Sequence, residues 1–120
     1  MRIIVVEDNP DIRECLELIL SDSGYSVMTF ASPEGIFAAI EEHKPDLILM
    51  DVMLEGHDGR DICKAIKANR ITGSIPVIII SATEGVEKTL ADCCASDFVA
   101  KPFDIDLLLS KIRSHLSVSN

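Results

Sequence analysis

The stretch RIIVVEDNPDIRECLELILSDSG, residues 2–24, has the pattern of one strand followed by one helix. The Ile- and Val-rich run at 2–6 is typical of a strand that is buried on both faces. Asn9 is a favourable N-cap residue, Pro10 suits the first helical position, and Gly24 is the residue type that commonly follows a helix end. We therefore expect a helix from Pro10 to just before Gly24, with an apolar face made of Ile12, Leu16, Ile19 and Leu20.

This unit of strand and helix recurs along the chain. Further Val-, Ile- and Leu-rich runs occur at 26–31, 46–50, 76–80 and 98–100. The segments that follow have helical apolar spacing and begin at Ser32-Pro33, Asp58, Glu84 and Asp104. We expect the second helix to finish near Lys44 and Pro45 and the fourth, weaker helix to span 84–94. Apolar strands joined by helical crossovers predict a doubly wound α/β domain, with a five-stranded parallel sheet and five helices on both faces.

Length and charge limit the classes of protein to consider. The 120 residues fit one domain, for which we expect a core at about 2–116 and a polar tail at 117–120. A net charge of −9 argues against direct binding of nucleic acid or an anionic membrane. The apolar runs are too short for a membrane span, and the first residues do not have the pattern of a signal peptide. We expect a cytoplasmic protein.

The four cysteines have no spacing typical of a zinc site or of a disulfide framework. They are Cys15, Cys63, Cys93 and Cys94. We expect them to be buried free thiols.

Polar residues follow four of the five predicted strands. They are Glu7, Asp8, Asp51, Ser81 and Lys101. In a doubly wound sheet ligands bind outside the carboxyl ends of the strands, so these side chains are candidates for one site. Three converging carboxylates require cations, which predicts a role for Lys101 and for a metal ion. Oxygen ligands favour Mg²⁺ or Mn²⁺.

Such a site suits the chemistry of phosphoryl groups. A carboxylate beside a divalent cation can attack phosphorus and form an aspartyl phosphate. The metal, Lys101 and the Ser81 hydroxyl would each contact one phosphoryl oxygen and neutralise its charge.

The same residues carry a resemblance to a known family. The matching pieces are Glu7-Asp8 after IIVV, Asp51 after LILM, MLEGHDG at 53–59, Ser81-Ala82 after VIII, and Lys101-Pro102-Phe103 after FVA. In this order they resemble the receiver domain of two-component response regulators, over about residues 2–116. The resemblance implies a flavodoxin-like sheet with strand order 2-1-3-4-5.

It also implies a role for each site residue. Asp51 is similar to the phosphoacceptor, and Glu7, Asp8, Asp51 and the Met53 backbone carbonyl are similar to the metal ligands. Lys101 and Ser81 resemble the phosphoryl-binding residues, and Ser81 and Phe98 resemble the switch pair. The Lys101-Pro102 bond is expected to be cis. Positions Met53 and Thr83 resemble those that tune dephosphorylation.

Partners follow from the resemblance as well. The phosphoryl donor would be a sensor histidine kinase or a phosphotransfer protein. The surface made by the fourth helix, fifth strand and fifth helix would then control a downstream protein or output domain, or mediate a homodimer. The chain would be a signalling switch that assists its own phosphorylation and dephosphorylation, and not an enzyme.

Two positions depart from the usual family pattern. Glu55 stands where the family usually has proline, and Cys94 stands where glycine commonly ends the fourth helix. The stretch from Ser81 to Lys101 is about two residues shorter than usual.

Three alternatives stay open at this point. A magnesium-dependent phosphohydrolase with Asp51 as nucleophile would need a second acid and a cap over the site. A flavodoxin-like binder would need a loop of backbone donors after the first strand, where Glu7 and Asp8 would repel a phosphate. The third alternative is an inactive receiver-like interaction module.

Overall fold

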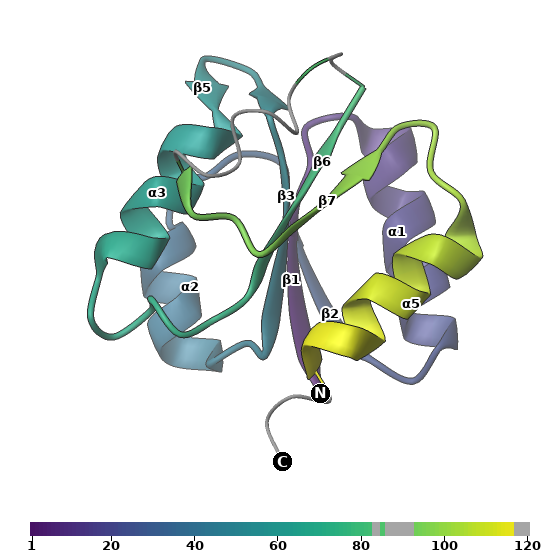
Figure 1. The fold of residues 1–120 in the computed structure, drawn as a ribbon, viewed down its shortest axis with the longest axis horizontal. Coiled ribbons are helices and arrows are strands. Elements are labelled where there is room, and N and C mark those ends of the chain that lie inside the picture. Colours follow the sequence, from purple (N-terminus) through teal and green to yellow (C-terminus); the bar gives the residue numbers. More distant parts are fainter. Residues whose placement is uncertain (83–84, 86–92, 117–120) are drawn as a thin grey trace.

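A five-stranded parallel sheet forms the centre of the computed structural model, which describes residues 1–82, 85 and 93–116 (Figure 1). Its strands are β1 (Arg2–Val6), β2 (Ser26–Phe30), β3 (Leu47–Asp51), β6 (Val77–Ser81) and β7 (Asp97–Ala100). They lie in the order β2-β1-β3-β6-β7, and every neighbouring pair is parallel. Taken as first to fifth, these strands have the expected order 2-1-3-4-5.

Helices cover both faces of this sheet (Figure 1). The helices α1 (Pro10–Asp22) and α5 (Ile105–Leu116) pack on one face, and α2 (Ile36–His43) and α3 (Gly59–Ala68) pack on the other. Side chains alternate between the two layers, so Leu49 joins the core under α1 and α5 while Met50 joins the core under α2 and α3. The doubly wound architecture is confirmed. No helix within the described ranges has the length and hydropathy of a membrane span.

Three helix starts lie where the sequence predicts them. The Asn9 carboxamide oxygen accepts hydrogen bonds from the backbone N–H groups of Asp11 and Ile12, at 2.9 and 3.2 Å. Asp58 caps α3, and the Asp104 carboxylate accepts from the N–H of Leu107 at the start of α5. These caps satisfy amide groups that have no partner inside their helices.

The predicted start of the second helix is wrong. We expected it at Ser32-Pro33, but α2 begins at Ile36, after a turn. Gly35 has a φ of +76°, in the left-handed region, and this interrupts the right-handed helix that Pro33 would otherwise begin. The helix ends at His43 and is followed by Lys44, as expected.

The structure contains one element that the sequence did not predict, and two predicted segments lie mostly outside the described residues. A short antiparallel hairpin of β4 (Met53–Leu54) and β5 (His57–Asp58) follows β3, and no alternation in the sequence marks strands that short. The expected fourth helix at 84–94 and the tail at 117–120 lie almost wholly outside the described residues.

Two of the four cysteines are exposed, although all four were expected to be buried. Cys63 and Cys93 are buried, whereas Cys15 and Cys94 are exposed. Cys94 has a φ of +61°. This left-handed conformation explains why a glycine suits the position.

Candidate functional site

Three acids meet at the carboxyl edge of the sheet. Asp51 is the last residue of β3, and Glu7 and Asp8 follow β1, which pairs with β3 up to Val6 and Met50. Each acid offers a carboxylate oxygen that lies within 4.8 Å of the other two. Glu7 is 1% exposed, Asp51 is 3% exposed, and Asp8 is half-buried. The parallel register therefore brings Asp51 together with Glu7 and Asp8, which lie more than 40 positions earlier in the chain.

Lys101 neutralises part of this charge. Its Nζ donates to Glu7 Oε1 at 2.5 Å and to Asp51 Oδ2 at 3.1 Å. The Lys101 N–H donates to the Ser81 carbonyl, which ties the loop after β7 to the end of β6. The Lys101–Pro102 peptide bond is cis, the isomer that the family resemblance implies.

Burial and crowding change the acidity of these groups. The pKa of Glu7 is raised to about 7, first because burial disfavours its charge and then because of its interaction with Asp51, which Lys101 only partly offsets. Burial by itself would lower the pKa of Lys101. Its hydrogen bonds to Glu7 and Asp51 outweigh burial, so the pKa of Lys101 is raised and the ammonium stays charged.

Backbone groups hold two of the carboxylates. The Asn9 N–H donates to Glu7 Oε2 and the Met53 N–H donates to Asp51 Oδ1, both at 3.2 Å. The start of α3 also packs closely on Asp51, because a Cβ on Gly59 would lie only 1.9 Å from the Asp51 carbonyl oxygen. Only glycine fits there without a shift of the backbone.

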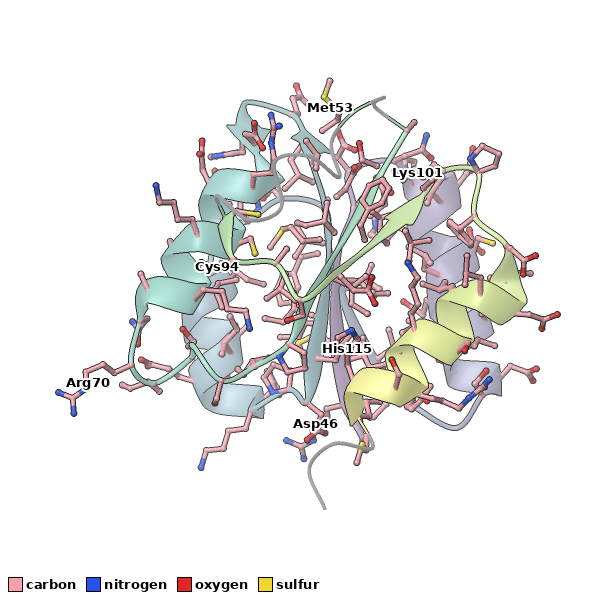
Figure 2. The ribbon with its side chains drawn as sticks, in the orientation of Figure 1. Asp46, Met53, Arg70, Cys94, Lys101 and His115 are labelled. Atoms are coloured by element: carbon pink, nitrogen blue, oxygen red, sulfur yellow. The ribbon has the colours of Figure 1, made fainter. Side chains whose placement is uncertain are left out.

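The remaining predicted residues lie at different distances from this cluster. Ser81 is buried at the end of β6, one residue beyond the partner of Asp51. Figure 2 places Met53 and Lys101 at the same end of the molecule, and the Met53 side chain is 65% exposed. Phe98 is half-buried and packs against the core beneath α2 and α3. Thr83 lies outside the described residues.

The donor set fits a hard divalent cation. The three acids present only oxygen atoms, and with all groups ionised a single lysine leaves the cluster negative. Oxygen-only sites that are open to water on one side suit Mg²⁺ or Mn²⁺ better than zinc. The half-buried Asp8 provides that open side.

The sequence did not predict that Arg13 contacts the site. Arg13 Nη1 on α1 donates to the carbonyl oxygens of Glu7 and Asp8, at 2.9 and 3.4 Å. Arg13 is one helical turn after the Asn9 cap, and helical side chains point back toward the N-terminus. That position was the available signal, but the sequence alone could not tell a solvated arginine from a bound one.

Comparison with known proteins agrees with this geometry. Residues 3–113 match the family described as the response regulator receiver domain. The chain is 32% identical over 117 residues to the DNA-binding response regulator MtrA of Mycolicibacterium smegmatis, covering 96% of this chain and 50% of that protein. The chain thus spans about half the length of such curated relatives.

Solved structures give the same result. A putative response regulator from Chloroflexus aurantiacus J-10-fl has a TM-score of 0.89 and 30% identity, with 97% of both chains covered. The receiver domain of the sensor histidine kinase PA1611 from Pseudomonas aeruginosa PAO1, with a magnesium ion in its active site cleft, has a TM-score of 0.87 and 28% identity, again with 97% of both chains covered. This chain therefore belongs to the response regulator receiver domain family of two-component signalling.

Proposed function

We propose that Asp51 is the phosphoacceptor of this receiver domain. The observation that carries the proposal is the position of its carboxylate, which is buried at the end of β3, beside two further acids and 3.1 Å from the Lys101 ammonium. A carboxylate oxygen of Asp51 would attack phosphorus, so that an acyl phosphate bond forms while the bond from phosphorus to the donor breaks. Family membership supports this chemistry.

The other side chains would then stabilise the phosphoryl group. Glu7, Asp8, Asp51 and the Met53 backbone carbonyl would hold Mg²⁺, which when bound supplies positive charge beside the phosphoryl oxygens. Lys101 can donate to a phosphoryl oxygen because its ammonium has three donors, two of which now contact Glu7 and Asp51. The Ser81 hydroxyl would serve another oxygen from the end of β6. In this way the chain would assist its own phosphorylation.

The Met53 backbone N–H donates to the same carboxylate, and the Met53 side chain is exposed. We propose that Met53, together with Thr83, sets how fast water reaches the acyl phosphate.

The partners we propose are those of the family. A histidine kinase or a phosphotransfer protein would donate the phosphoryl group, and a downstream protein, an output domain or a second copy would receive the signal. The relatives support this reading, since MtrA is a DNA-binding response regulator and PA1611 is a sensor histidine kinase. Of the expected output surface, β7 and α5 are described, and Ser81 and Phe98 would couple the site to it.

Intact-mass spectrometry after incubation with acetyl phosphate and Mg²⁺ tests the proposal. Wild type should gain one phosphoryl group, which alkali removes as it does from any acyl phosphate. Asp51→Asn should gain none. Asp46→Asn is the matched control, because Asp46 directly precedes the other end of the same strand, and it should react like wild type. A base-stable adduct, or unchanged labelling of Asp51→Asn, would refute the role of Asp51.

A further inference from the structure

Arg13 donates hydrogen bonds to the backbone directly after the end of β1. Its Nη1 lies 2.9 Å from the Glu7 carbonyl oxygen and 3.4 Å from that of Asp8. The Arg13 N–H also donates to the Asn9 carbonyl, so the arginine is anchored in the first turn of α1. A single guanidinium thereby links α1 to the two consecutive peptide groups of Glu7 and Asp8.

The three acids differ in what positions their carboxylates. Glu7 accepts from Lys101 and from the Asn9 N–H, and Asp51 accepts from Lys101 and from the Met53 N–H. In contrast, no group within residues 1–82, 85 and 93–116 donates a hydrogen bond to the Asp8 carboxylate. The direction of the Asp8 side chain therefore depends on its own backbone, where Arg13 is the side chain that donates to the carbonyl oxygens of Glu7 and Asp8.

We propose that Arg13 is a positioning residue for metal binding, which acts by aiming the Asp8 carboxylate at the cation. The proposal rests on the proposed function, since it assumes that Mg²⁺ binds between the acids. Groups that orient a metal ligand contribute to affinity without touching the metal.

Charge and positioning make opposite predictions for this residue. A positive charge close to a cation site weakens cation binding, so removal of Arg13 by charge alone would tighten the binding of Mg²⁺. If Arg13 positions Asp8, the same removal weakens it. The sign of the change in affinity therefore separates the two roles.

The test is a titration of the full chain with MgCl₂, followed by the backbone amide NMR signals near Asp51. Arg13→Met keeps the apolar stem and removes all donors, and we expect its Kd for Mg²⁺ to rise about tenfold. Arg13→Lys keeps the charge and one donor group, so its Kd should lie between those of wild type and Arg13→Met. An unchanged or lower Kd in Arg13→Met would overturn the proposal.

A matched control and a double-mutant cycle exclude a merely structural role. Arg2 donates to the His43 carbonyl at the opposite end of β1, so Arg2→Met should leave the Kd unchanged. In an Asp8→Asn background, Arg13→Met should have little further effect, because its target is already lost. Additive losses, or equal losses in Arg2→Met, would overturn the proposal. If Arg13→Met does not fold, the Arg13→Lys cycle decides in the same way.

Failure of the proposed function has a different signature. If wild type itself does not bind Mg²⁺ at millimolar concentration, the metal site is wrong. If wild type binds and Arg13→Met binds equally well, only the role of Arg13 is wrong.

Discussion

The two ends of strand β3 each carry an aspartate, and the two residues have opposite environments. Asp46 precedes the strand at the amino edge of the sheet, is exposed, and accepts a hydrogen bond from the Arg2 N–H at 2.8 Å. Asp51 ends the strand at the carboxyl edge, is 3% exposed, and shares Lys101 with Glu7. Figure 2 shows Asp46 at one end of the molecule and Lys101 at the other.

The difference teaches that position in the sheet, more than residue type, decides what an acid can do. At the amino edge, water and a backbone N–H satisfy the carboxylate, and its charge costs little. At the carboxyl edge several acids are buried together, and one lysine does not offset their repulsion. Crowded buried acids are unfavourable as anions alone, and in the function proposed above a bound cation would offset their charge.

Removal of Lys101 should change the free energy of unfolding more than any other substitution considered for the two edges. Lys101→Met leaves Glu7 and Asp51 buried without their cation, which should lower the free energy of unfolding by about 3–5 kcal/mol at pH 8 in chelator. Lys44→Met, at the exposed amino edge, should change it by less than about 0.5 kcal/mol. Urea denaturation measures both. Equal effects would mean that the two edges have similar electrostatics.

Two glycines extend the comparison to packing. A Cβ on Gly59 would lie 1.9 Å from the Asp51 carbonyl oxygen, and a Cβ on Gly73, at the amino edge, would lie 2.8 Å from two backbone carbonyl oxygens. Both alanine variants should be less stable, Gly59→Ala by about 3 kcal/mol and Gly73→Ala by less. Only Gly59→Ala should also slow phosphorylation by acetyl phosphate, because it displaces Asp51. Slow phosphorylation of a folded Gly73→Ala protein would contradict this.

The pKa of Glu7 predicts how stability depends on pH. The unfolded carboxyl loses its proton near pH 4.5, whereas the folded one keeps it up to about pH 7. The folded state therefore binds more protons in this window, and stability should fall by about 2 kcal/mol as the pH rises from 5 to 8 in chelator. Denaturation at several pH values measures the slope. Glu7→Gln should flatten it, and an equally steep slope in that variant would assign the effect to other groups.

The smallest expected effect is a gain in stability. Asp51→Asn removes one of the crowded charges, so in chelator its free energy of unfolding should be about 1 kcal/mol higher than that of wild type. Mg²⁺ should then stabilise wild type more than the variant. Asp46→Asn should show no gain and a normal response to Mg²⁺. Identical responses of Asp51→Asn and wild type to Mg²⁺ would place the metal elsewhere.

Local signals in the sequence predicted local structure well. The Asn9 cap, the Asp58 cap and the apolar runs identify α1, α3 and the strands, because each signal acts on residues a few positions away. The start of α2 was mispredicted, since Pro33 is equally suited to a turn and the left-handed Gly35 decided between the two. The β4–β5 hairpin has only two residues in each strand, too few to show a pattern.

The sequence by itself determined the order along the chain of the five strands of the parallel sheet and of the described helices, and with it the set of polar residues that end those strands. The alternation of apolar runs and caps is sufficient for this, because hydrogen bonding within helices and the burial of apolar strands act through short-range patterns. Family resemblance added the expected role of each residue. Glu7, Asp51 and Lys101 are all residues that sequence reasoning selected.

Only the tertiary structure decided the electrostatics of the site. The contact of Lys101 with Glu7 joins residues 94 positions apart, and its contact with Asp51 joins residues 50 positions apart. The raised pKa of Glu7 and the carbonyl contacts of Arg13 depend on burial and on distances of about 3 Å. Coulomb and hydrogen-bond energies change steeply over that range, so they follow from how the chain packs and not from its order.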